Sequence, residues 1–256
     1  MPQDNWHFIK RLIAYETKAV GAYGLHSPFV YRLYTDFIRM KRNFISPEIE
    51  ALRKTAQRSA ADISVKDFKS GTTKLRKLGS EARSPPSKAS FSAFLSQLLN
   101  YLGAECALET GTSLGFNALY LAESNVKEVW TLEGNESIAK IAAAHFSQLK
   151  SEKINLITGD IHETFETTLK NTGADVIFLD ADHRSVAISK FMELIHPYLS
   201  GIKCIIIHDI YWSKDMTYIW EKLITDPRFP MTIDIFQAGL LFPNQKLEKQ
   251  HFIVKF

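Results

Sequence analysis

The chain has 256 residues, of which 45% are hydrophobic and 23% are charged, and its formal net charge is +3. This composition suits a globular protein with one substantial core. Its apolar runs are strand-sized, which excludes the stretch of roughly 20 apolar residues that a membrane span needs. Residues 1–10 also lack the apolar core of a signal peptide. We therefore expect a cytoplasmic protein with no membrane span.

The charge is unevenly distributed along the chain. Residues 1–100 carry 17 Lys and Arg against 8 Asp and Glu, whereas the remaining residues carry 14 against 20. We call residues 1–100 the basic front; such a segment can bind an anionic substrate, a nucleic acid or a membrane surface. No interleaved aromatic residues and no run of five like charges accompany it. Solvated lysines on helices are therefore favoured over a nucleic-acid partner, which stays open.

The first hundred residues predict helices and irregular segments. A helix is expected over Trp6–Ala19, and the turn at His26-Ser27-Pro28 leads into a second helix that ends near Met40. Gly, Ser, Lys and Pro mix in the segment Asp62–Pro86, which predicts a lid or a linker. We expect an N-terminal helical region over residues 1–86 and a second domain over 87–256.

A regular pattern begins at Ser87. Apolar residues recur at three- and four-residue steps up to Leu102, and Gly103 supplies a helix stop. Five β-α repeats follow, which predicts a parallel sheet with helices on both faces. The expected strands are Ala107–Glu109, Val129–Glu133, Ile154–Thr158, Asp175–Asp180 and Lys203–Asp209. The expected helices are Phe116–Glu123, Glu136–Lys150, Glu163–Lys170, Val186–Leu199 and Lys214–Ile224.

The C-terminal end breaks this alternation. Three strand-like runs follow one another without an intervening helix, at Thr232–Phe236, Gly239–Phe242 and His251–Phe256. This predicts that the sheet closes with an antiparallel hairpin. A purely parallel dinucleotide-binding fold would not end in this way.

A carboxylate follows each of the five expected parallel strands. These residues are Glu109, Glu133, Asp160, Asp180 and Asp209. Ligands of open α/β sheets bind at the carboxyl ends of the strands. One such residue alone would be read as a helix cap or a solvated turn residue, but the whole set predicts a site at this edge.

The loop Glu109–Gly115 turns from strand to helix and contains two glycines that permit close backbone approach. It is not a G-x-G-x-x-G dinucleotide fingerprint, because Ser113 occupies the place of the second glycine. The carboxylate of Glu109 beside the turn suits a cationic ligand, such as an ammonium or a sulfonium. Glu133, 18 residues beyond Gly115, is placed to bind two ribose hydroxyls.

Four motifs in order carry a family resemblance. ALETGTSLGFNALYLA at 107–122, TLEGN at 131–135, TGD at 158–160 and DVIFLDADH at 175–183 resemble class I S-adenosylmethionine-dependent methyltransferases of the catechol O-methyltransferase-like group. HSPFVY at 26–31 and KQHFIVKF at 249–256 resemble a bacterial branch of this group and imply no substrate. The resemblance implies a Rossmann-like, doubly wound sheet of seven strands, mostly parallel, with an antiparallel C-terminal hairpin and an N-terminal helical extension.

The resemblance also implies roles for individual residues. Gly111, Ser113 and Asn117 would line the methionine end of S-adenosylmethionine, Glu133 would bind the ribose, and the segment from Asp160 to His162 would lie beside the adenine. Asp180 would lie near the methyl group. The complete expected cofactor set is Glu109, Gly111, Thr112, Ser113, Gly115, Asn117, Glu133, Gly134, Asp160, Ile161 and Asp180.

Metal dependence is doubtful. In metal-dependent members of the group, an aspartate and an Asp-Asn pair bind a divalent ion. The resemblance matches that aspartate to Asp180 and that pair to Asp209-Ile210. Isoleucine offers no oxygen to Mg²⁺, so we expect no metal ligands, although Asp182 and His208 could substitute.

The residues expected to act in catalysis also differ from the pattern of the family. The family's lysine, which helps to deprotonate the acceptor hydroxyl, corresponds here to His183, and histidine can accept a proton near neutral pH. We predict His183 and Asp209 as catalytic residues. Alternatively, His183 caps the following helix and His208 acts in its place, and Trp212 either forms an acceptor wall or packs the helix.

The predicted function is O-methylation of a small-molecule acceptor. An RNA methyltransferase that uses the basic front, and a cofactor-binding protein without catalysis, stay open. A NAD-dependent oxidoreductase is disfavoured by the missing glycine and by the antiparallel ending. A homodimer formed through the N-terminal helices is a further open expectation.

Overall fold

The computed structural model describes residues 4–66, 72–83, 88–243 and 248–256. The chain groups into two compact units. We call residues 40–172 the central unit, and residues 1–39 together with 173–256 the terminal unit. Both units combine parallel strands with helices, which confirms the predicted α/β fold class. The domain boundary near residue 86 stays a prediction.

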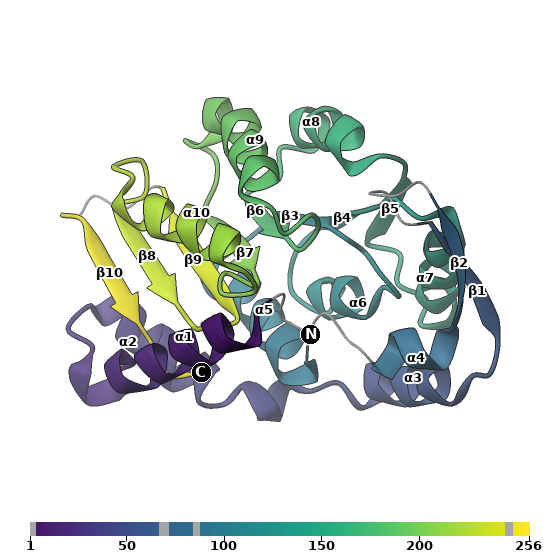
Figure 1. Cartoon of the computed structure of the whole chain (residues 1–256), viewed down its shortest axis with the longest axis horizontal. Helices are drawn as coiled ribbons and strands as arrows, with labels where there is room; N and C mark the ends of the chain where they lie inside the picture. The colour runs from purple at the N-terminus through teal and green to yellow at the C-terminus, as the bar shows by residue number, and fades with distance from the viewer. Residues whose placement is uncertain (1–3, 67–71, 84–87, 244–247) are drawn as a thin grey trace. The chain divides into compact units, whose positions relative to one another are not determined.

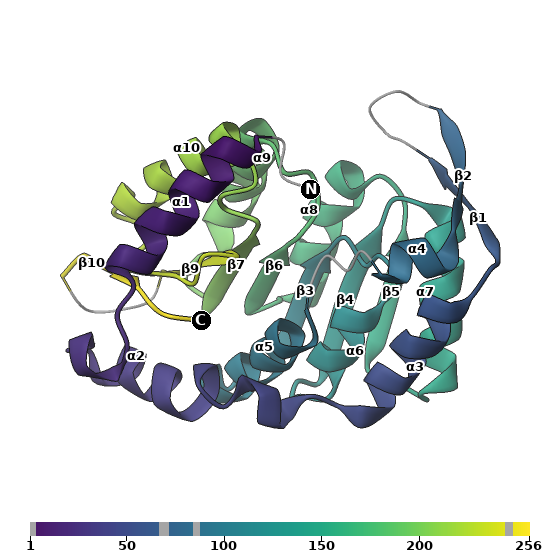
Figure 2. The same cartoon turned by 60° about the horizontal axis from the view of Figure 1, so that its bottom comes forward.

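Three parallel strands form the main sheet of the central unit. Their order is β3 (Cys106–Thr110), β4 (Glu128–Glu133) and β5 (Ile154–Thr158). They alternate with α6 (Phe116–Ala122), α7 (Glu136–Gln148) and α8 (Ile161–Thr172). Figures 1 and 2 show α8 on one side of these strands and α6 on the other. Every residue of β3 is buried, as expected for a strand covered on both faces.

The central unit begins with elements that the sequence only partly predicted. They are η3 (Lys41–Phe44), α3 (Pro47–Arg58), β1 (Asp62–Lys66), β2 (Thr73–Lys77), α4 (Leu78–Arg83) and α5 (Ala89–Leu102). α3 was not predicted, although its start carries a clear signal. The Ser46 hydroxyl accepts a hydrogen bond from the Ile49 backbone N–H, and Pro47 follows at the first helical position. α5 ends as predicted at Gly103, where φ is 59°.

Part of the segment predicted as a lid or linker, at 67–71 and 84–86, lies outside the described residues. In its described part, β1 and β2 pair as an antiparallel hairpin, from Asp62 opposite Lys77 to Lys66 opposite Thr73. Figure 2 shows this hairpin beside α7. The regular pairing shows that this part of the segment has secondary structure of its own; a lid function stays a prediction.

Five strands form the sheet of the terminal unit. Their order is β10 (Gln250–Ile253), β8 (Met231–Asp234), β9 (Ala238–Phe242), β7 (Cys204–His208) and β6 (Val176–Leu179). β6 and β7 are parallel, and β9 runs antiparallel to both β7 and β8, which confirms the antiparallel hairpin. β10 pairs parallel with β8 at the edge. The terminal unit has five of these strands and the central unit has three, which makes eight. The sequence predicted seven, and β10 is the additional strand.

The helices of the terminal unit come from both ends of the chain. They are α1 (Asn5–Lys18), η1 (Ala22–Gly24), α2 (Pro28–Arg32), the π-helix η2 (Leu33–Ile38), α9 (Ser185–Ile195), η4 (His196–Tyr198) and α10 (Lys214–Thr225). Both predicted N-terminal helices are confirmed. No helix in the described ranges is long and apolar enough to cross a membrane.

Side-chain contacts hold α1 against α10 and against the end of the chain. His7 Nε2 lies 2.9 Å from Thr217 Oγ1, and Arg11 forms an ion pair with Glu221. The Tyr15 hydroxyl donates to the Val254 carbonyl over 2.6 Å. Figures 1 and 2 show the resulting side-by-side arrangement of α1 and α10. The N-terminal helix is therefore an integral part of the terminal unit.

Candidate functional site

The loop between β3 and α6 turns sharply, as its glycines predicted. Gly111, Ser113 and Gly115 all have positive φ, at 87°, 50° and 83°. The backbone N–H groups of Gly111 and Thr112 both donate to the Leu132 carbonyl, which ties the loop to β4. Ser113 adopts its conformation at some cost, because a non-glycine residue is uncommon in the left-handed region.

Gly115 has a packing role that the sequence did not reveal. A Cβ at this position would lie 2.5 Å from the ring of Phe146 and 3.2 Å from the Ala142 Cβ. Both residues belong to α7, so this helix fills the space beside the glycine. The cofactor contact that the sequence predicted for Gly115 stays a prediction.

Glu109 is the centre of a buried network. Its side chain is 1% exposed. Asn117 Nδ2 donates to Glu109 Oε1 over 2.7 Å, and Thr131 Oγ1 donates to Glu109 Oε2 over 2.5 Å. The hydroxyls of Thr112 and Thr131 lie 2.6 Å apart. Sequence reasoning missed Thr131, because its pairing with Glu109 depends on the register between β3 and β4.

Glu133 lies at the end of β4 with both carboxylate oxygens held. The Ser113 N–H donates to Oε2 and the Asn135 N–H donates to Oε1, each over 2.8 Å. Burial raises the pKa of Glu133, and the backbone N–H groups of Asn135, Ser113 and Gly134 partly offset this. Gly134 therefore helps to orient this carboxylate. An ionised carboxylate has about four acceptor positions, so Glu133 can accept further hydrogen bonds.

Asp160 and Ile161 lie at the start of α8. The backbone carbonyl of Asp160 accepts from Glu163 and Thr164, and its Oδ1 accepts from the His162 N–H. Asp160 is exposed and Ile161 is half-buried. The Gly159 N–H donates to the Glu133 carbonyl over 3.0 Å, so the ends of β4 and β5 meet as predicted. The structure gives Asp160 a helix-capping role; adenine contact stays a prediction.

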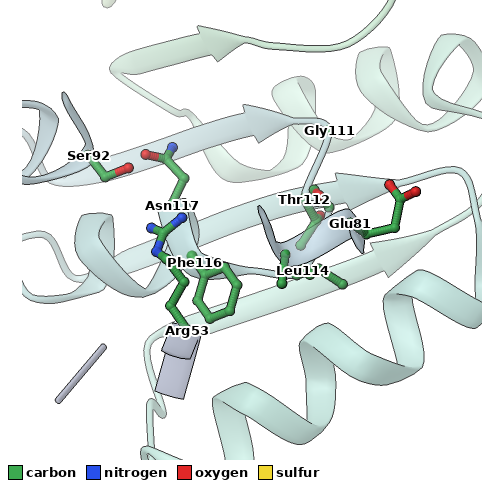
Figure 3. Close-up of a pocket in the computed structure, with 10 residues that line it drawn as sticks. Arg53, Glu81, Ser92, Gly111, Thr112, Leu114, Phe116 and Asn117 are labelled. Carbon is green, nitrogen blue, oxygen red and sulfur yellow. The ribbon is translucent and has the colours of Figure 1, made fainter. Parts of the chain in front are cut away.

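A pocket in the central unit borders this loop. Gly111, Thr112, Ser113, Leu114, Phe116 and Asn117 line one part of it, and Arg53 from α3, Glu81 and Ala82 from α4, and Ser92 from α5 complete the lining (Figure 3). Sequence reasoning missed these last four residues. One signal existed: Arg53 shares a face of α3 with the buried residues Ile49, Leu52 and Ala56, and a basic residue on an apolar helix face is unusual.

The remaining predicted residues cluster in the terminal unit. Asp180 directly follows β6, and His208 is the last residue of β7. The His208 Nδ1 lies 2.7 Å from Asp180 Oδ1. His183 Nε2 lies 3.7 Å from Asp209 Oδ2 and 3.9 Å from Asp180 Oδ1. The side chain of His183 is 26% exposed, whereas that of His208 is 4% exposed. His183 also faces Trp212, with ring centroids 6.3 Å apart.

We define the His-Asp cluster as Asp180, His183, His208 and Asp209. The pKa values of His208 and Asp209 are both raised. Burial alone would lower the pKa of His208, but the adjacent Asp180 carboxylate outweighs it and raises the pKa to about 9. Burial raises the pKa of Asp209, against the opposing effect of His208 and His183. His208 is therefore a cation at neutral pH, and its imidazolium neutralises Asp180.

The cluster does not fit a divalent metal ion. The Ile210 side chain is fully buried and supplies no ligand, and the cationic His208 already pairs with Asp180. Across the parts of the chain that the structure describes, no three His, Cys, Asp or Glu residues are grouped so as to hold a metal. We therefore derive no chemistry through a metal.

The His208–Asp180 pair predicts a pH dependence of stability. The pKa of His208 rises from 6.5 to about 9 on folding, so its stabilising effect is complete below pH 6.5 and is lost as the pH rises through 9. With about 1.4 kcal/mol per pKa unit, the free energy of unfolding should fall by about 3 kcal/mol between pH 6 and pH 10. Urea denaturation at both pH values measures this.

The variant His208→Gln should lose this fall in unfolding free energy, whereas His196→Gln, which changes an exposed histidine, should retain it. An identical pH dependence in wild type and His208→Gln would contradict the assigned ion pair.

Comparisons with known proteins agree with this architecture. Residues 108–210 match a family described as a methyltransferase domain, and no curated protein matches the chain in sequence. The structure resembles the SAH-bound methyltransferase PaMTH1 of Podospora anserina, with a TM-score of 0.61, 15% identity and coverage of 81% of this chain and 93% of that chain.

Two O-methyltransferases are also similar. The Bacillus cereus enzyme in complex with SAH has a TM-score of 0.53 at 17% identity, covering 80% of this chain and 96% of that one. TomG of Streptomyces achromogenes, in complex with SAM, has a TM-score of 0.50 at 16% identity, covering 62% and 82%. Identities this low establish the shared fold. The family match shows that residues 108–210 are similar to a methyltransferase domain.

Proposed function

We propose that the protein transfers a methyl group from S-adenosylmethionine to an oxygen of a small-molecule acceptor. The observation that carries this proposal is the fixed carboxylate of Glu133, which lies beside the left-handed turn of a methyltransferase domain. The similar solved enzymes include complexes with SAH and SAM, and the family match supports the same cofactor here.

The residues of the central unit fit this cofactor. Both oxygens of Glu133 can accept hydrogen bonds from the two ribose hydroxyls while they keep their backbone donors. The buried Glu109 places negative charge beside the loop, which suits a sulfonium or an ammonium. The buried Asn117 Oδ1 has no hydrogen-bond partner among the described residues, as expected of an acceptor that is satisfied by a ligand.

Catalysis requires alignment of the acceptor and removal of its proton. When bound, S-adenosylmethionine supplies a methyl group on positively charged sulfur. The acceptor hydroxyl would have to lose its proton to a base when it takes this group. Within the His-Asp cluster, His183 is partly exposed and faces two carboxylates, so it can take this proton and have the resulting charge stabilised. The Asp180 carboxylate raises the pKa of His208, and the His208 side chain is buried, so His183 is the better candidate for the base.

Cofactor binding is tested by thermal unfolding. At about 100 times its dissociation constant, a ligand contributes roughly 2.7 kcal/mol. For a chain of this length, that corresponds to a rise in Tm of roughly 5–10 °C. We expect this rise with S-adenosylmethionine and with SAH, and none with NAD at the same concentration.

The comparison with NAD separates the two classes of cofactor. A rise in Tm with NAD and none with either adenosyl ligand would refute the methyltransferase proposal and favour an oxidoreductase.

A further inference from the structure

The positive charge of the chain is concentrated in residues 40–88. This segment carries 12 Lys and Arg against 5 Asp and Glu, a net charge of +7, whereas the remaining residues carry 19 against 23, a net charge of −4. The segment includes α3, β1, β2 and α4, which all belong to the central unit. A surface with this excess of positive charge attracts anions.

The end of α3 gathers cations from three elements. The Arg83 guanidinium of α4 donates a hydrogen bond to the Gln57 carbonyl. The Lys77 ammonium of β2 donates to the Ala60 carbonyl over 3.2 Å. Both carbonyls lie within two residues of the exposed Arg58. Figures 1 and 2 show α3, α4 and β2 next to one another, so cations from separate elements share one region of the central unit.

We define the basic patch by the exposed cations of these elements. They are Lys54 and Arg58 of α3, Lys74, Arg76 and Lys77 of β2, and Arg83 of α4. Arg76 pairs with Glu81, and Lys77 pairs with Asp62. Within the described ranges, no carboxylate forms an ion pair with the other four cations. The patch therefore presents four uncompensated positive charges to solvent.

The cations of the basic patch are regularly spaced. Lys54 and Arg58 are separated by one helical turn, which is about 6 Å along the axis of α3. Lys74 and Arg76 share one face of β2 and lie about 7 Å apart along the strand. Successive nucleotides of one strand rise by about 3.4 Å in a nucleic-acid duplex. Each pair of cations therefore matches a step of two nucleotides.

The apolar surface of these elements is too small for attachment to lipid. Leu75 is 76% exposed, and no other large apolar side chain is exposed on the described parts of α3, β1, β2 and α4. Segments that lie in a membrane interface bury a continuous apolar face. Every residue of β2 is exposed, and a two-stranded ribbon with exposed basic residues is a known means of binding a nucleic acid. These observations favour a nucleic acid over a lipid surface.

We propose that the basic patch binds the phosphodiester backbone of a nucleic acid, with Lys54, Arg58 and Lys74 donating to phosphate oxygens. The patch lies outside residues 108–210, which are similar to a methyltransferase domain. The inference therefore does not depend on the cofactor or the acceptor proposed above. RNA and DNA share this backbone chemistry, so both are used in the test.

Fluorescence anisotropy measures binding to labelled oligouridylate RNA and oligothymidylate DNA of about 20 nucleotides, which is longer than a usual single-strand site. Each contact between a cation and a phosphate of a single strand adds about 0.7 to the slope of log affinity against log salt concentration. We expect the triple variant Lys54→Gln, Arg58→Gln, Lys74→Gln to reduce this slope by about 2 and to weaken binding by about 100-fold at about 50 mM salt. The oligonucleotide that the wild type binds more tightly distinguishes RNA from DNA.

A charge-matched variant separates the basic patch from net charge. Lys170→Gln, Lys190→Gln, Lys222→Gln removes three exposed lysines from α8, α9 and α10, and it should keep the affinity and the salt slope of the wild type. The patch variant should keep the Tm of the wild type, because its three exposed side chains make no hydrogen bond or ion pair with the described residues.

Each outcome supports or overturns the proposal. A loss of affinity and of salt slope in the patch variant alone supports the basic patch as the binding surface. Equal losses in the patch variant and the charge-matched variant would overturn it, because net charge would then account for the binding. Failure of the wild type to bind either oligonucleotide would also overturn it, and sedimentation with phosphatidylglycerol vesicles would then show whether the patch binds a lipid surface instead.

Discussion

Glu133→Ala should weaken SAH binding by about 100-fold or more. Each hydrogen bond from a ribose hydroxyl to the ionised carboxylate corresponds to about 1.5–3 kcal/mol, and two such bonds are lost together. The substitution also removes the acceptor of the Ser113 N–H, so the glycine loop loses one of its hydrogen bonds to β4 and keeps those to the Leu132 carbonyl. Calorimetry with SAH measures the loss of affinity.

The ligand-free fold must be monitored alongside, because the N–H groups of Ser113 and Asn135 both lose their acceptor. A fall in Tm is therefore expected, and circular dichroism should show that the variant is folded at the temperature of the titration. Glu128→Ala, which alters the exposed first residue of the same strand, is the matched control. SAH affinity in Glu133→Ala within threefold of wild type would remove Glu133 from the cofactor site.

His183→Ala should lower kcat for methyl transfer by about 10²- to 10⁴-fold, the usual contribution of a general base. SAH affinity should stay unchanged, because the residue is assigned to the acceptor proton and not to the cofactor. SAH formation from S-adenosylmethionine, with a panel of catechols and phenols as acceptors, measures kcat. The two variants thus separate binding from chemistry: Glu133→Ala acts on affinity and His183→Ala on turnover.

His196→Ala is the control for His183→Ala, since His196 is an exposed histidine of the same unit. A kcat retained within threefold in His183→Ala would assign proton removal to another group, for which Asp209 is the neighbouring candidate at 3.7 Å. A loss of SAH affinity in His183→Ala would instead place this histidine in the cofactor site.

Local pattern was sufficient for most elements of the fold. The five β-α repeats, the stop at Gly103 and the antiparallel hairpin all follow from periodicity and turn residues. These signals lie within one element or between neighbours in the chain, so they can be read without tertiary structure. The glycine turn and the carboxylates at the strand ends were predicted for the same reason.

Other features depend on distant parts of the chain. β10 becomes an edge strand because it pairs with β8, and α1 packs on α10 through side chains more than 200 positions away, as with His7 and Thr217. Helix α3 had a capping signal at Ser46, and Arg53 stands out as a basic residue on its buried face. That Arg53 lines the pocket beside the glycine loop depends on how α3 packs.

The sequence by itself predicted the resemblance to a methyltransferase domain, the carboxylates at the ends of the strands and the departure at Ile210, because each is a local motif. Only the tertiary structure decided what those carboxylates contact. It gives Glu109 the donors Asn117 and Thr131, gives Asp180 the cation of His208, and brings Arg53 and Ser92 to the loop. Burial and charge pairing are properties of residues brought together from separate elements, which is why protonation and ligand preference appear only in the folded chain.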